Sequence, residues 1–248
     1  ISQRAAIFSL LHDGESRIKN FSRAEDPLST LACVEQLGAM IKRRGNELRI
    51  TGTGRFELKP EVSDLECGNS GTCMRLLSGV IAGAGLSIKL TGDPSLSSRS
   101  MKRIITPLEM IGARILARDE DYAPLYITRL GDFQSIEYEL PVASAQVKSC
   151  VLLAGLFGEE ETTVIERVQS RDHTERLLKL ETEELEGKRF IRSSLKNEIP
   201  EQTYTIPADF SSAAFWLVAG SIVPDSEILL KGVGLNPTRT ALLDLLTE

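Results

Sequence analysis

The sequence contains no long apolar run, almost no histidine and no paired cysteine motif, and each absence excludes a class of protein. No apolar stretch reaches the roughly 18–20 residues that a membrane-spanning helix needs, and we see no signal-peptide pattern. The four cysteines, Cys33, Cys67, Cys73 and Cys150, have unrelated spacings, with only two histidines in the chain. We therefore predict no metal site and no disulfide framework, but reduced, mostly buried thiols in a cytoplasmic protein.

Positive charge is also in short supply. The 248 residues include 29 Lys and Arg against 35 Asp and Glu, which gives a net charge of −6 at pH 7. Nucleic acids and anionic membranes attract basic surfaces, so we expect neither a nucleic-acid partner nor a membrane partner. The 42% hydrophobic content is typical of a globular protein with a substantial core. A small anion can still bind a local cluster of basic side chains.

Four apolar helices open with small and polar residues, at nearly regular intervals along the chain. Ser2, Ser70, Ala145 and Ser211 mark the openings, about 70 residues apart. Self-similarity at a near-constant period indicates that one supersecondary unit is repeated. A helix start carries unpaired N–H groups and the positive end of the macrodipole, both of which favour anions. Several such starts therefore indicate an anionic ligand.

The expected elements follow the order βαβαββ in two of the repeats. The first repeat is predicted as helix 2–11, strand 16–21, helix 24–44 and strand 47–51. The second is predicted as strand 64–67, helix 74–84, strand 86–91, helix 101–111 and strands 114–118 and 125–129. The third is predicted as strand 135–140, helix 145–157, strand 162–167, helix 174–185 and strands 189–193 and 203–206. A fourth copy begins with helix 211–222 and strand 227–231.

The two helices of each repeat differ in character. Residues 76–84, 151–157 and 213–218 are apolar on all sides, as buried helices are. Helices 24–44 and 174–185 carry a charged face and are expected nearer to solvent. We predict an α/β (α+β) fold in which buried parallel helices are covered by sheets and the helix N-termini converge on one face.

Two polar junctions ahead of helices carry candidate binding residues. Residues 65–75 combine a strand, a tight turn and a helix start. They form either a well-capped helix or a cradle in which Gly71 lets a ligand approach the main chain. Residues 92–101 form a polar loop around Arg99, which is either solvated or a bidentate clamp on a carboxylate or phosphate. The sequence alone leaves these alternatives open.

Two further junctions have the same character. Ser144 and Gln146 begin the third apolar helix, where they either cap it or face a ligand. Lys148 follows in that helix and needs a partner, either a ligand or a carboxylate. Ser170 and Arg171 belong to a loop rich in donors, but no Gly-x-Ser-x-Gly elbow or ordered triad supports a hydrolase. These residues lie at equivalent ends of the repeated units, which favours a shared binding role.

In these stretches the chain resembles the enolpyruvyl transferases, and among them the 5-enolpyruvylshikimate-3-phosphate synthases. The stretches that carry the resemblance run from end to end in the same order: 1–5, 69–75, 92–101, 140–149, 170–176, 206–214 and 234–239. The resemblance implies two lobes, each of three βαβαββ units, with the active site between them. It also implies transfer of the enolpyruvyl group of phosphoenolpyruvate to the 5-hydroxyl of shikimate 3-phosphate, with release of phosphate and without a metal or organic cofactor.

The resemblance further implies which residues hold the two anions. Shikimate 3-phosphate would contact Arg4, Ser144, Gln146, Ser170 and, with less support, Arg171. Phosphoenolpyruvate would contact Gly71, Arg99 and Gln146. Gln146 would then lie between the two ligands, and Gly71 would leave room for the inhibitor glyphosate.

The chain departs from the family pattern at both ends. The family's Lys-Ser pair before Ile1 is absent, as are the acidic and basic groups of most of the second lobe. We therefore expect residues 1–208 to form one lobe and residues 209–248 a truncated start of the second. The isolated chain is predicted to lack turnover, and the complete protein to be a monomer. Two alternatives remain: the related transferase that acts on UDP-N-acetylglucosamine, and a non-catalytic anion-binding half-fold.

Overall fold

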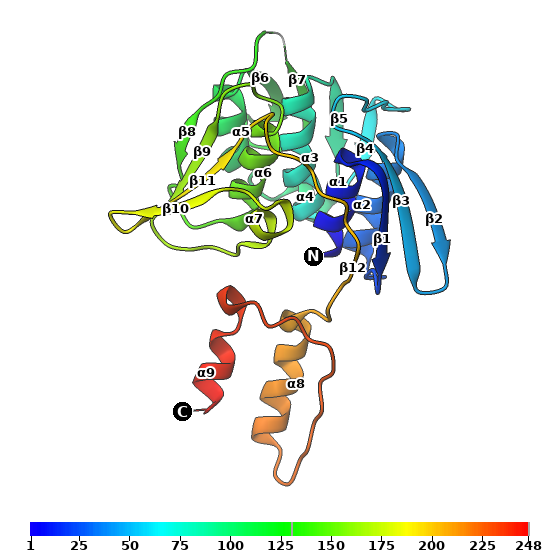
Figure 1. The fold of residues 1–248 in the computed structure, drawn as a ribbon, viewed down its shortest axis with the longest axis vertical. Helices are drawn as coiled ribbons and strands as arrows, with labels where there is room; N and C mark the ends of the chain where they lie inside the picture. The colour runs from blue at the N-terminus through cyan, green and yellow to red at the C-terminus, as the bar shows by residue number, and fades with distance from the viewer. Residues whose placement is uncertain (130, 248) are drawn as a thin grey trace.

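Four-stranded sheets wrap around central helices in the computed structural model, which describes residues 1–129 and 131–247 (Figure 1). The first unit comprises α1 (Ser2–Leu11), β1 (Asp13–Lys19), α2 (Glu25–Gln36), β2 (Met40–Arg44) and β3 (Glu47–Thr53). The second comprises β4 (Asp64–Glu66), α3 (Gly71–Ala84), β5 (Ile88–Thr91), α4 (Pro94–Ser97), α5 (Lys102–Met110), β6 (Ala113–Arg118) and β7 (Tyr122–Arg129).

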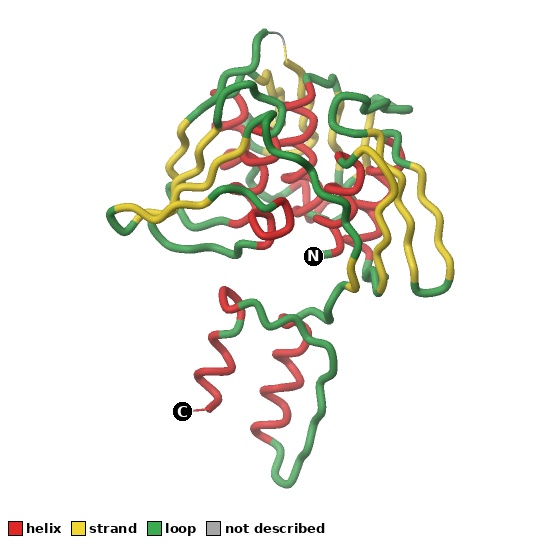
Figure 2. Tube along the Cα trace, viewed as in Figure 1, coloured by secondary structure: helices red, strands yellow, loops and turns green. Residues whose placement is uncertain are grey.

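The third unit and a C-terminal segment follow. The third unit comprises β8 (Glu137–Glu139), α6 (Ala145–Gly155), β9 (Thr162–Glu166), α7 (His173–Leu178), β10 (Thr182–Leu185) and β11 (Lys188–Ser193). The chain then passes through β12 (Tyr204–Thr205) to α8 (Phe210–Ile222), the 3-10 helix η1 (Pro237–Arg239) and α9 (Ala241–Thr247). These last three elements lie apart from the sheets; a long loop joins α8 to η1, and α9 follows η1 closely (Figure 2).

The three sheets of the described chain share one topology. Their strand orders are β12-β1-β3-β2, β4-β5-β7-β6 and β8-β9-β11-β10, with the first pair parallel and the others antiparallel. Each sheet with its helices is therefore one βαβαββ unit, and the predicted fold class is confirmed.

The leading strand of the first unit comes from far along the chain. Residues 203–206 were expected to end the third unit, but β12 instead pairs in parallel with β1, with Ile18 opposite Tyr204. The Asn20 side chain also donates to the Ile206 carbonyl at 2.7 Å. The first sheet is therefore completed by a strand from the end of the third unit. No local sequence pattern can reveal such a long-range pairing.

The central helices α3 and α6 pack closely and in parallel. A Cβ on Gly79 would lie 2.1 Å from the Cys150 carbonyl oxygen, and one on Gly83 would lie 2.8 Å from that of Ala154. Both helices advance by four residues between these contacts, so they run in the same direction. Almost every residue of α3 and α6 is buried, as their apolar sequences predict.

Two predicted helices are too long. Helix 24–44 ends at Gln36, because Gly38 adopts a φ of +112° and residues 40–44 turn back to pair with β3. Helix 174–185 ends at Leu178, and residues 182–185 form β10. In both cases a short β-hairpin follows the helix. The first strand of that hairpin, β2 or β10, is rich in charged residues, and its sequence resembles the charged face of a longer helix.

The predicted strand 227–231 is also wrong, since those residues are irregular in the structure. Among the described residues after Ile206, β-structure is limited to an isolated bridge between Ala208 and Val233. Within the described residues, none of the helices combines the length and apolar character that crossing a bilayer requires.

Candidate anion-binding site

The first residues of α1, α3 and α6 lie together and are tied by hydrogen bonds. Gln3 of α1 donates to the Ser70 hydroxyl, which caps α3, at 2.5 Å. Gln146 of α6 donates to Thr72 of α3 at 2.8 Å. Arg4 of α1 donates to the Ala145 carbonyl at 3.5 Å. The predicted convergence of helix N-termini is therefore present, and their positive dipole ends share one face.

Arg4 is buried at the centre of this face. Its Nε donates to Thr174 Oγ1 at 2.9 Å, and its Nη2 donates to Ser149 Oγ at 3.0 Å. Arg4 thus joins the starts of α1, α6 and α7. Burial, followed by the positive charge of Arg171, lowers the pKa of Arg4 to about 10, against the opposing effect of Glu175.

Gln146 bridges α6 and α3 through Arg75. Arg75 Nη1 donates to Gln146 Oε1 at 2.9 Å, and Nη2 donates to the Ser100 carbonyl at 3.2 Å. A Cβ on Gly71 would lie 2.7 Å from the same Arg75 nitrogen and 3.6 Å from Arg99 Nη1. The start of α3 therefore has two guanidinium groups beside a bare main chain, as an anion cradle requires.

Arg99 is exposed, yet it is held in place. Its Nη2 donates to Asn69 Oδ1 at 2.6 Å and to Ser95 Oγ at 3.2 Å. Asn69 in turn donates to Asp93, whose carboxylate caps α4. These hydrogen bonds connect the turn before α3 to the loop before α5, so Arg99 faces the cradle from a fixed position.

Ser170 belongs to a buried charge network. Its hydroxyl and backbone N–H both donate to Glu166 Oε1. The other Glu166 oxygen lies 2.8 Å from Lys148 Nζ, which also lies 2.6 Å from Glu175 Oε1. The Lys148–Glu175 contact is off the hydrogen-bonding direction, so it is Coulombic. Of the two partners that the sequence left open for Lys148, a ligand or a carboxylate, the structure shows carboxylates.

The start of α7 contacts the C-terminal segment. Asn236 donates to Asp172 Oδ1 at 2.7 Å and lies 3.4 Å from His173 Nε2. Burial, reinforced by the nearby positive charge of Arg4, lowers the pKa of His173 to about 4. His173 is therefore neutral near pH 7 and can accept or donate a hydrogen bond there.

Positive charges crowd this face. The pKa of Arg171 is lowered by burial and by Arg239, and the pKa of Arg75 is lowered by burial and by Arg99 and Arg103. Like charges that depress one another's pKa values are stabilised by an anion between them. This electrostatic arrangement is the strongest sign of an anionic ligand, although the chain as a whole is acidic.

The structure brings the predicted residues to one face but gives several of them protein partners. Ser144 caps α6, accepting from Val147 N–H at 3.4 Å, and remains half-exposed. Arg171 is exposed and accessible to a ligand. Gln3 and Arg75 were not predicted, although both belong to the stretches that carry the family resemblance. The available signal was a polar residue in the first turn of an apolar helix, for Gln3, or one turn further in, for Arg75.

Comparisons with known proteins agree with this geometry. The sequence matches the family described as EPSP synthase (3-phosphoshikimate 1-carboxyvinyltransferase) over residues 1–248. It is 52% identical over 249 residues to a 3-phosphoshikimate 1-carboxyvinyltransferase of Salinibacter ruber, covering 99% of this chain and 58% of that protein. A relative of the same name from Thermodesulfovibrio yellowstonii is 47% identical, with the same coverage.

A solved structure of EPSP synthase from Acinetobacter baumannii has a similar fold. Its TM-score is 0.88 at 38% sequence identity, and the match covers 99% of this chain and 56% of that one. The chain therefore spans somewhat more than half the length of the relatives that it matches. The repeated units, the converging helix starts and these matches together show that the chain belongs to the EPSP synthase family.

Proposed function

We propose that this chain is the substrate-binding part of an enzyme that transfers the enolpyruvyl group of phosphoenolpyruvate to the 5-hydroxyl of shikimate 3-phosphate. Phosphate is released, and the product belongs to the shikimate pathway of aromatic amino-acid biosynthesis. The observation that carries the proposal is the meeting of three helix N-termini with crowded arginines. Both substrates carry phosphate and carboxylate groups, which such a face favours.

Each substrate has its own set of contacts. Shikimate 3-phosphate is held around the starts of α1 and α6 and the Ser170 loop, by Arg4, Ser144, Gln146, Ser170 and Arg171. Phosphoenolpyruvate occupies the cradle at the start of α3, beside Gly71 and Arg99, with Gln146 between the ligands. Fixing the hydroxyl of one substrate next to the enol carbon of the other replaces a bimolecular encounter by a positioned one.

The chemistry also needs groups that we assign to the rest of the enzyme. Protonation of the enol carbon, attack by the hydroxyl and loss of phosphate require acid–base groups. We assign residues 1–208 to the first lobe and residues 209–248 to the start of the second, whose remainder supplies those groups. The isolated chain should then bind shikimate 3-phosphate weakly and turn over nothing, and the completed enzyme acts as a cytoplasmic monomer.

Binding is tested by isothermal titration calorimetry with shikimate 3-phosphate and, separately, with UDP-N-acetylglucosamine. We expect affinity for shikimate 3-phosphate only, with a loss of at least about tenfold in Arg171→Ala, which equals about 1.4 kcal/mol. Arg114→Ala is the matched control. Arg114 is also an exposed arginine, but it lies on β6 in the second unit, whereas Arg171 lies in the loop before α7 in the third unit. Equal effects of the two substitutions, or preference for the nucleotide sugar, would contradict the proposal.

Turnover is tested by complementation. The chain is mixed with the remaining C-terminal part of the Salinibacter ruber relative, and phosphate release from the two substrates is measured. Restored release excludes a non-catalytic half-fold, whereas robust release by the chain alone would show that it is catalytically complete.

Gly71 offers a second test of the phosphoenolpyruvate cradle. In Gly71→Ala the new methyl group displaces the Arg75 guanidinium, which holds Gln146. We expect weaker binding of phosphoenolpyruvate and of glyphosate by the complemented enzyme. The loss of shikimate 3-phosphate affinity should be smaller, because that ligand shares Gln146 but also contacts Arg4 and Ser170. Inhibition by glyphosate that is unchanged in this variant would count against the assigned cradle.

A further inference from the structure

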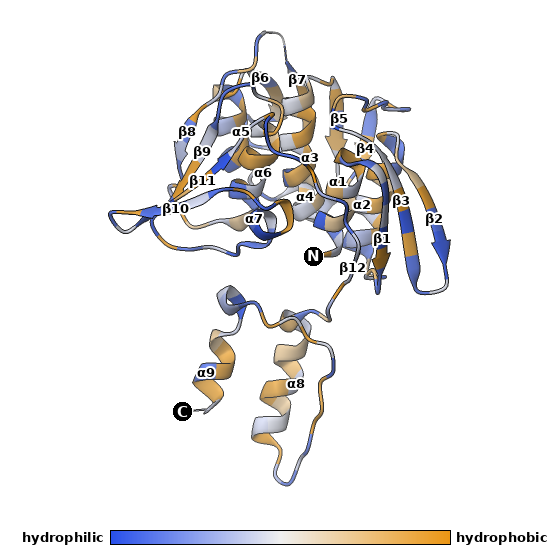
Figure 3. Ribbon diagram, viewed as in Figure 1, coloured by the Kyte–Doolittle hydropathy of each residue, from blue (hydrophilic) through white to orange (hydrophobic). Residues whose placement is uncertain are grey.

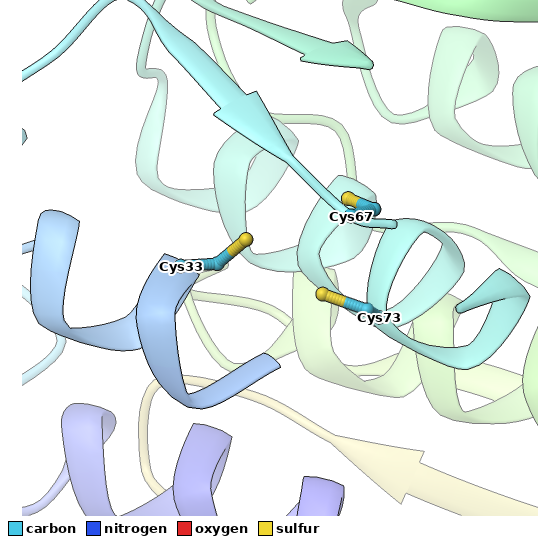
Figure 4. Close-up of side chains that lie close together, drawn as sticks. All are labelled: Cys33, Cys67 and Cys73. Atoms are coloured by element: carbon cyan, nitrogen blue, oxygen red, sulfur yellow. The ribbon is translucent and has the colours of Figure 1, made fainter. Parts of the chain in front are cut away.

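Three cysteines that are scattered in the sequence come together behind the turn that precedes α3. Cys33 lies on α2, Cys67 follows β4, and Cys73 lies in the first turn of α3 (Figure 4). Their sulfur atoms all lie within 4.8 Å of one another. All three side chains are fully buried, and none forms a disulfide. The spacings in the sequence gave no sign of this cluster.

The spacing of the sulfurs suits a single metal ion. A metal–sulfur bond of about 2.3 Å places the sulfur atoms of a three- or four-coordinate site about 4 Å apart. The cluster needs shifts of less than about 1 Å to reach that geometry. Side chains that converge this closely from two helices and a turn form a pocket of fixed shape, as a metal site requires.

The donor set selects a soft ion. Thiolates prefer thiophilic ions such as copper(I) and zinc, and disfavour magnesium and calcium. Structural zinc almost always takes four protein ligands. Among the described residues no histidine, aspartate, glutamate or further cysteine joins this cluster. Three sulfurs without a fourth ligand therefore fit copper(I) better than zinc.

The start of α3 offsets part of the negative charge that three thiolates bring to the site. Cys73 is the third residue of α3, where the positive end of the helix dipole stabilises a thiolate. The Cys33 thiol donates to the Glu66 carbonyl at 3.4 Å, so binding of an ion displaces this proton.

We propose that Cys33, Cys67 and Cys73 form a three-thiolate site for one soft, thiophilic metal ion, with copper(I) as the best match. Loading forms three copper–sulfur bonds, breaks three S–H bonds and releases the three protons to solvent, with no change of oxidation state. Because Gly68 and Asn69 are half-exposed, the turn between Cys67 and Cys73 is the entry route. The bound ion ties α2 to the start of α3.

The test is titration of the reduced chain with copper(I), in competition with a chromogenic copper(I) chelator. The chain is refolded with the ion so that the buried cluster reaches equilibrium. We expect one ion per chain, and at least tenfold weaker binding in each of Cys33→Ser, Cys67→Ser and Cys73→Ser. Cys150→Ala is the control, because Cys150 is a buried thiol on α6 outside the cluster.

A second measurement does not depend on whether the variants fold. It is X-ray absorption spectroscopy of the unsubstituted chain, loaded with one equivalent of copper(I). Three sulfur neighbours at about 2.3 Å support the proposal. Fewer than three sulfurs, sub-stoichiometric binding, or binding that persists when all three cysteines are replaced would overturn it. Tighter binding of zinc, with a fourth light ligand, would overturn the assignment to copper(I).

Discussion

Helices α3 and α8 are both strongly apolar, yet only α3 is buried. In α3 nearly every residue is inaccessible, whereas in α8 only Phe210 and Ala213 are buried. Phe215 and Trp216 of α8 are 79% and 61% exposed. In Figure 3 the ribbon of α8, which carries hydrophobic colouring, stands away from the sheets, whereas α3 lies among them.

The difference shows what an apolar helix sequence can and cannot specify. Apolar character on all sides predicts that a helix tends to be buried, but it does not specify which helix or sheet covers it. Helix α3 has α6 and its glycine contacts, whereas α8 has no such partner among the described residues. We propose that α8 is the counterpart of α3 in a second lobe, whose sheets would cover it.

The largest expected loss of stability comes from a substitution in the buried helix α6, which packs against α3. Lys148→Ala leaves Glu166 and Glu175 as buried carboxylates without their cation, which costs about 3–5 kcal/mol. The free energy of unfolding is measured by urea denaturation. Lys188→Ala is the control, because Lys188 is half-exposed in its pair with Glu139 and should cost at most about 1 kcal/mol. Similar losses in the two variants would show that burial does not govern these ion pairs.

A pair of glycines sharpens the comparison of the helices themselves. Gly79→Ala places a methyl group against the Cys150 carbonyl and should destabilise the body by about 3 kcal/mol. Gly220→Ala on α8 meets only the flexible end of Ile228, 3.2 Å away, and removes backbone freedom from the unfolded chain. It should be neutral or stabilising, by up to about 1 kcal/mol. Thermal melts decide the outcome, and a loss of stability in Gly220→Ala as large as that in Gly79→Ala would contradict the comparison.

The junction between the two regions should respond to pH. The pKa of His173 is about 4 in the folded protein and about 6.5, the ordinary histidine value, in the unfolded chain, so the folded state binds fewer protons between these values. Stability is therefore fully present above pH 6.5 and falls as the pH drops to 4. Partial exposure limits the loss to about 1–2 kcal/mol. His173→Gln should flatten this part of the stability profile, and an unaltered slope would contradict it.

The smallest effect is expected on the unpartnered helix. Phe215→Ser should change the free energy of unfolding by less than about 0.5 kcal/mol, because the ring is exposed. It should reduce self-association, measured by sedimentation velocity, because a large apolar patch is removed. A stability loss comparable to that of a core substitution would mean that α8 already has a partner.

Local patterns predicted much of the fold. The bounds of α1 were predicted to the residue, and the repeated unit emerged from the spacing of apolar helices. One failure came from a contact between distant residues, and two came from short hairpins that the helical pattern concealed. Strand β12 pairs with β1 across the whole body, and β2 and β10 are polar edge strands whose partners, not their own sequences, make them strands.

The candidate site divides in the same way. Residues at helix starts, such as Gly71 and Ser144, were predictable because caps and turns have local signatures. The Lys148–Glu166–Glu175 network and the three-cysteine cluster were not, because each joins elements that only the fold brings together. The resemblance to a family suggested candidate binding residues, and the structure shows which side chains hold them.

The most direct test of the account is where shikimate 3-phosphate binds. In amide chemical-shift mapping of the labelled chain, we predict that saturable changes gather at the starts of α1, α3 and α6 and around Ser170. Added salt should weaken them, because the attraction is electrostatic. Saturable changes confined to the outer faces of the sheets, or none at millimolar ligand, would contradict the claim that converging helix starts form the anion site.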